Sequence, residues 1–182
     1  YVGSGQDAIY GLDYSVTPVG QIAARPFSCE AVIRNTGSSS QSAVLKYDVT
    51  GPATYSGSSV AIVLAGSDSA IVAAIPTFYP GVGQYTVEMW AEADSAGAGI
   101  TTTMSDIVTK NIEVSAYLYG KDEGAATGAR TIGGPDDQNE ITTRFEIYAN
   151  ADLTALRVFI DDESVVGANI YAILYESDTT AA

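Results

Sequence analysis

Short runs in which apolar and polar residues alternate, separated by turn residues, constrain the fold of this chain more than any other feature. In the run 84–93, the odd-numbered positions from Tyr85 to Ala91 are apolar, and the even-numbered positions are polar except for Trp90. Successive side chains of a β-strand point to opposite faces, so this period predicts a strand with one buried face. Comparable runs occupy 7–16, 27–35, 42–50, 60–64, 69–75, 84–93 and 107–114. Their close spacing predicts an all-β fold.

The run 84–93 also indicates which kind of β-fold to expect. Tyr85 opens this sixth strand directly after the Pro-Gly-Val-Gly corner at 80–83. A tyrosine at this place resembles the tyrosine corner of immunoglobulin-like sandwiches. We therefore expect its hydroxyl to bond back to the backbone of the corner and its ring to pack inward. Residues 1–115 are predicted to form an immunoglobulin-like β-sandwich.

The strand pattern restarts after Ser115 and predicts a second unit over residues 116–182. A short strand at 117–120 and a long polar segment precede three further runs, at 141–149, 153–160 and 169–175. These runs predict a second antiparallel β-domain, sandwich-like or jelly-roll-like. Four strands are few for a closed sandwich, so either this unit packs on the first one or it is an incomplete part of something longer. We favour an incomplete second unit.

Charge and composition exclude several classes of partner. The net charge is −14, from 22 acidic and 8 basic residues. Nucleic acid is not expected as a partner, because phosphate contacts require clustered Lys or Arg. Membrane insertion is not expected either, since no apolar run approaches the roughly 18 residues of a spanning helix. Cys29 is the single cysteine and shares the apolar face of its run, which predicts a core residue and no intrachain disulfide.

The absence of histidine bears directly on catalysis. Without it, Ser-His-Asp and Cys-His nucleophile systems and histidine-based metal sites cannot be built. A glycosidase needs only two carboxylates, but it also needs a cleft that an ordinary sandwich of this size does not supply. We therefore expect a protein that is not an enzyme.

Three aromatic residues are candidates for contact with a ligand or partner: Trp90, Tyr55 and Tyr79. Trp90 is expected to point outward between Glu88 and Glu92. Large aromatic side chains anchor interfaces and stack on sugar rings. The alternative is that a neighbouring loop or the second unit covers this tryptophan.

Acidic residues of the long polar segment are candidates for a metal site. Asp136, Asp137 and Glu140, joined by Asp122, could hold a structural Ca²⁺, which takes six to eight oxygen ligands. A solvated turn is the alternative, and it is the interpretation we favour. No other cofactor is expected.

Several motifs bear a family resemblance. The segments AVIRNTG at 31–37, LKYDVTG at 45–51 and GQYTV at 83–87 resemble the CARDB-type, immunoglobulin-like repeats of large secreted proteins of Bacteroidota. The segments YGKDEG at 119–124, 145–160 and 166–175 are similar to the jelly-roll-like modules that often follow such repeats. The resemblance implies an exported protein, often sent out by the type IX route, and it carries no catalytic residues.

These observations together predict a non-enzymatic structural or adhesive module of a secreted or cell-surface bacterial protein. Its expected partners are other protein chains or extracellular glycans. Exposed strand edges would allow it to form homo-oligomers or filaments. The alternative is a carbohydrate-binding or accessory module of a secreted polysaccharide-degrading enzyme or protease.

Overall fold

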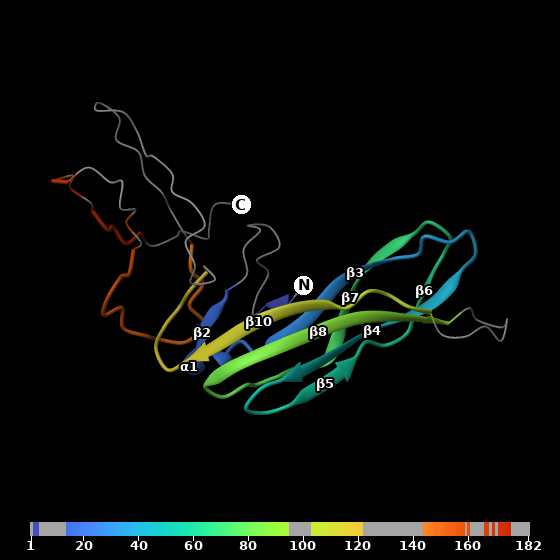
Figure 1. Ribbon diagram of the computed structural model, residues 1–182, viewed down its shortest axis with the longest axis horizontal. Coiled ribbons are helices and arrows are strands. Elements are labelled where there is room, and N and C mark those ends of the chain that lie inside the picture. The colour runs from blue at the N-terminus through green and yellow to red at the C-terminus, as the bar shows by residue number, and fades with distance from the viewer. Residues whose placement is uncertain are drawn as a thin grey trace. The chain divides into compact units, whose positions relative to one another are not determined.

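The computed structural model describes residues 2–3, 14–94, 103–121, 144–158, 160, 166–167, 169 and 171–175. They belong to two compact units: Tyr1–Glu123 together with Ile147–Ala149, and Gly124–Glu146 together with Asn150–Ala182. The strands described are β1 (Val2–Gly3), β2 (Val16–Pro18), β3 (Phe27–Arg34), β4 (Gln41–Thr50), β5 (Tyr55–Ser58), β6 (Ile62–Leu64), β7 (Ser69–Phe78), β8 (Gly83–Asp94), β9 (Thr103–Met104) and β10 (Val108–Ser115). One short helix, α1 (Val19–Ile22), follows β2 (Figure 1). The all-β prediction is confirmed.

The ten strands belong to one mixed sheet in the order β1-β3-β7-β5-β4-β8-β10-β2, with β6 paired to β4 and β9 to β8. All pairs are antiparallel except β10 with β2. The sheet curls so that β3 and β7 share a core with β4, β8 and β10. A single residue pair, Ser58 with Ile75, joins β5 to β7. The immunoglobulin-like assignment of this unit stays a prediction.

The core consists of the inward side chains of alternating strand positions. Its buried members on the main strands are Phe27, Cys29 and Ile33 of β3, Leu45, Tyr47 and Val49 of β4, Val72, Ala74 and Phe78 of β7, Tyr85, Val87 and Met89 of β8, and Ile112 and Val114 of β10. Burial raises the pKa of the Cys29 thiol to about 12, so this residue packs as a neutral group. The predicted inward faces of the run 84–93 and of Cys29 are confirmed.

The predicted tyrosine corner is present. The Tyr85 hydroxyl donates a hydrogen bond to the carbonyl oxygen of Gly81 at 3.1 Å. Its ring is buried, and Gly51 lies so close that a Cβ there would stand 2.6 Å from the ring. The start of β8 is therefore locked to the preceding corner and to the turn after β4.

Two strand predictions differ from the structure in unit 1. The expected strand at 7–16 is replaced, in its described part, by β2, which begins at Val16. Strand β5 was not expected, because its sequence YSGS shows no apolar alternation. Gly57 makes β5 fit here: a Cβ on it would stand 2.3 Å from the carbonyl oxygen of Ile75 and 2.6 Å from the Tyr47 ring. Such close packing is invisible in the sequence.

The strands expected at 141–149, 153–160 and 169–175 are not formed by the described residues of those ranges. Their apolar side chains are exposed, as in Leu156 at 55% and Tyr171 at 80%. Alternation gives a segment the capacity to be a strand, but a strand also needs a neighbouring ladder and a surface on which to bury one face.

Asn35 closes the end of the unit where β3 leads into β4. Its side-chain amide donates to the carbonyl oxygens of Ser39, Leu64 and Ala65 at 2.8–3.1 Å, and its carbonyl oxygen accepts from the Gly37 amide at 2.9 Å. The residue is buried. One side chain thus satisfies backbone groups of two loops, which gives the Asn-Thr-Gly motif a structural role.

Replacing Asn35 with alanine should lower the free energy of unfolding by about 2–3 kcal/mol, because buried backbone groups lose their partners. Urea denaturation followed by circular dichroism measures the change. Thr36→Ala, at the exposed neighbouring position, is the control and should be nearly neutral. Equal stability of the two variants would contradict this role for Asn35.

A second buried amide binds a distant part of the chain. Gln21 of α1 accepts hydrogen bonds from the amides of Tyr148 and Ala149 and donates one to the carbonyl oxygen of Ala149, each at 2.8 Å. The Arg25 guanidinium lies 5.3 Å from the centre of the Tyr148 ring. The side chain of Gln21 therefore treats 147–149 as a neighbouring strand would, and it attaches this short segment to unit 1.

The Gln21→Leu variant should release the 147–149 segment, since leucine fills the space but offers neither donor nor acceptor. Hydrogen–deuterium exchange should show faster exchange of the Tyr148 and Ala149 amides, by about tenfold or more for each 1.4 kcal/mol of local stability lost. Gln84→Leu, at an exposed position of β8, is the matched control. Unchanged protection in Gln21→Leu would contradict the assignment.

Candidate ligand-contact face

Residues of four neighbouring strands form rows across the outward face of the sheet. Lys46 of β4 lies opposite Ser58 of β5 on one side and Trp90 of β8 on the other. Ser58 is in turn opposite Ile75 of β7. A shorter parallel row contains Ser56, Asp48 and Glu88. The two rows place aromatic, hydroxyl, ammonium and carboxylate groups beside one another.

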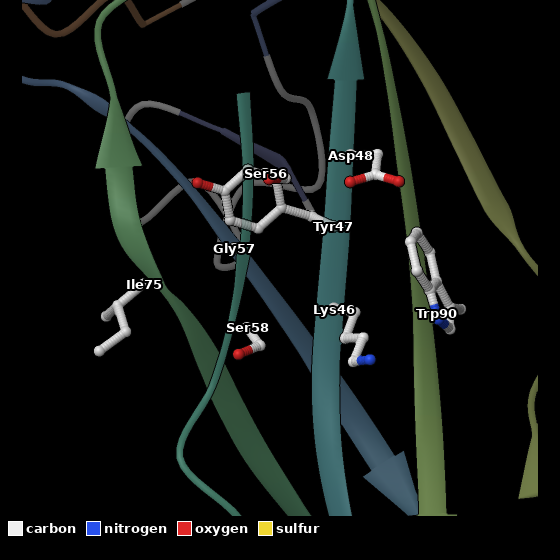
Figure 2. Close-up of a pocket in the computed structure, with 8 residues that line it drawn as sticks. All are labelled: Lys46, Tyr47, Asp48, Ser56, Gly57, Ser58, Ile75 and Trp90. Carbon is white, nitrogen blue, oxygen red and sulfur yellow. The ribbon is translucent and has the colours of Figure 1, made fainter. Parts of the chain in front are cut away.

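These rows border an open depression with a volume of about 490 Å³, which we call the Trp90 depression (Figure 2). Its lining residues are Lys46, Tyr47, Asp48, Ser56, Gly57, Ser58, Ile75 and Trp90. Gly57 contributes to its shape, since this position of β5 has no side chain. The site is therefore shallow and built on paired strands.

Trp90 is fixed in place by a carboxylate. Its indole Nε1 donates a hydrogen bond to Oε1 of Glu92 at 3.0 Å, and Oε2 of Glu92 lies 2.8 Å from Nζ of Lys46. The ring is half-buried. The hydrogen bond from Lys46, and after it the one from Trp90, lowers the pKa of Glu92 below its ordinary value. Ring, carboxylate and ammonium thus form one polar network that holds the indole against the sheet.

Of the three aromatic candidates, only Trp90 borders the depression. The Tyr55 ring packs against Phe78 at a centroid distance of 5.4 Å, and its hydroxyl donates to the carbonyl oxygen of Tyr79 at 3.1 Å. Tyr79 itself is 58% exposed. The structure therefore brings Tyr55 and Tyr79 together, but it does not align them with Trp90.

The four calcium candidates, Asp122, Asp136, Asp137 and Glu140, lie outside the described residues. Within the described part of the chain, no group of three or more His, Cys, Asp or Glu side chains is placed to hold a metal ion. The calcium site stays a prediction.

The residues that surround Trp90 were not identified from the sequence. The alternation of 42–50 does separate Lys46 and Asp48 from the inward residues of that run. Their encounter with Trp90, however, depends on the register between β4 and β8. Ser56 and Ser58 gave no signal, because they belong to the unexpected strand β5.

The arrangement suits reversible binding of a polar ligand. A half-buried indole offers a stacking surface, and the hydroxyls of Ser56 and Ser58, the Asp48 carboxylate and the Lys46 ammonium offer both donors and acceptors. Shallow sites with these groups are suited to hydroxyl-rich molecules.

Comparison with protein-family models, curated proteins and solved structures finds no match for this chain. Among the described residues, no helix is long and apolar enough to cross a membrane. The function must therefore be argued from the geometry of the site.

The network around Trp90 should respond to acid. Because the pKa of folded Glu92 is lowered, the carboxylate keeps its two partners above the ordinary value and loses them as the pH falls through the lower, folded value. Trp90 is the single tryptophan, so its fluorescence reports this step. We expect a transition with its midpoint below 4.5, the ordinary pKa of glutamate.

The Lys46→Met variant should move this midpoint upward, toward 4.5, because it removes the larger cause of the shift. Lys110→Met removes the same charge from β10 and should leave the midpoint in place. A midpoint that does not respond to Lys46→Met would contradict the proposed network.

Proposed function

We propose that this chain is a non-enzymatic adhesive or structural module of an extracellular protein and that the Trp90 depression is its ligand contact. The observation that carries the proposal is the row Ile75–Ser58–Lys46–Trp90, which brings an anchored indole and polar groups together on one outward face. Side chains on paired strands are held more rigidly than those on loops, which favours recognition at a surface.

The charges of the site favour a neutral ligand rich in hydroxyl groups. Asp48 and Glu92 stand beside Trp90, and the chain carries a net charge of −14, so an anionic ligand would be repelled. The Lys46 ammonium already pairs with Glu92. Sugar rings combine apolar C–H faces, which stack on an indole, with hydroxyls that both donate and accept hydrogen bonds. A neutral extracellular glycan therefore fits the site best.

Binding to an array of neutral oligosaccharides tests the proposal. The wild-type chain should bind at least one class of glycan, and Trp90→Ala should weaken that binding about tenfold or more, as truncation of an anchoring aromatic does. Tyr117→Ala removes an aromatic side chain that is 94% exposed and outside the depression, so it serves as the matched control.

The proposal fails if the folded wild-type chain binds no glycan on the array. It also fails if Trp90→Ala binds as strongly as Tyr117→Ala, because the ligand would then contact another surface.

A further inference from the structure

One edge of β3 is only partly paired. Strand β7 lies along one side of β3, and β1 lies along the other, where Val2 and Gly3 pair with Cys29 and Ser28. Among the described residues, nothing pairs with the remainder of that edge, residues 30–34. Such an edge presents unpaired backbone donors and acceptors that can accept a further strand.

The outward side chains of this stretch have a symmetrical order. Val32 stands at the centre, 69% exposed, with Glu30 two residues before it and Arg34 two residues after it. Val32 is paired across the sheet with Ile71, which is 70% exposed, so the apolar surface continues onto β7. Within the described part of the chain, neither Glu30 nor Arg34 forms an ion pair.

We propose that two copies of this chain associate through this edge of β3, antiparallel and around a two-fold axis at Val32. Positions equally far from Val32 on opposite sides then face each other. Glu30 of each copy lies opposite Arg34 of the other, and Val32 lies opposite Val32. The result is a continuous sheet in the order β7–β3–β3–β7.

The order of charges identifies a second copy as the occupant of the edge. A two-fold interface uses the same patch on both subunits and must be complementary to itself. The sequence Glu-x-Val-x-Arg meets this condition only when it is reversed, as in antiparallel pairing. Parallel pairing in register would set Glu30 against Glu30 and Arg34 against Arg34, which is destabilising.

The outward surface of the joined sheet supports the same arrangement. Val32 and Ile71 of each copy would form one apolar stripe across four strands, with ion pairs on both sides of its centre. A register shifted by one residue would mismatch both the stripe and the charges. This interface does not involve Trp90, so it can hold or fail independently of the proposed glycan contact.

Complementary charge reversal tests the pairing. In Glu30→Arg, two arginines would face each other at both ends of the interface, and in Arg34→Glu two glutamates would. In sedimentation equilibrium at physiological salt, each variant alone should dimerise about tenfold or more weakly than the wild-type chain. An equimolar mixture of the two variants should form a heterodimer, because each Arg then meets a Glu.

Asp106→Arg makes the same charge change at an exposed position away from β3 and should leave dimerisation unchanged. A wild-type chain that stays monomeric up to roughly millimolar concentration would overturn the inference. So would folded single variants whose mixture remains monomeric.

A covalent probe checks the two-fold axis itself. Val32→Cys places two thiols directly opposite each other, at a Cα separation of about 4.5–5.5 Å that a disulfide can bridge. Air oxidation should give a disulfide-linked dimer. Val63→Cys, at a position that is 74% exposed, is the control for random collision. Equal cross-linking of the two variants would overturn the proposed register.

Discussion

The antiparallel register between β4 and β8 sets both the interior and the outward surface of unit 1. Nine consecutive residues of β4, from Ser42 to Thr50, pair with Asp94 to Thr86 of β8. In this register Tyr47 and Met89 face the core together, and Lys46 and Trp90 face outward together. A slip of one residue would expose the buried face and bury Lys46 and Asp48 without partners. The core and the Trp90 depression are therefore two consequences of one pairing.

The sequence predicts those features that are local in the chain. Alternation in 84–93 places Tyr85, Val87 and Met89 inside, and the corner before Tyr85 predicts its hydrogen bond to Gly81; both agree with the structure. Strand β5 escapes prediction because its pairing depends on Gly57 fitting against Tyr47 and Ile75, which are distant in the sequence. The same holds for the depression, since only the register of three strands brings Ser58 and Lys46 to Trp90.

The apolar pattern of the second unit shows the reverse case. Its runs alternate as clearly as those of the first unit, yet the described residues of 153–158 and 171–175 form no strand and expose Leu156, Val158 and Tyr171. Local preference for an extended backbone contributes little unless a ladder and a buried face accompany it. A pattern in the sequence thus predicts which face a strand would bury, but it does not supply the surface that buries it.

The two proposed surfaces would reinforce each other if both hold. The Trp90 depression lies on β4, β5, β7 and β8, whereas the free edge belongs to β3, so dimerisation would leave β8 uncovered by the pairing itself. Each dimer would then carry two depressions. A shallow site binds its ligand weakly, because it buries little of the ligand's surface. A repetitive polysaccharide could engage both sites of a dimer, and the second binding event would then occur at a high effective concentration. Dimerisation would in this way allow a weak, open site to support firm attachment to an extended glycan.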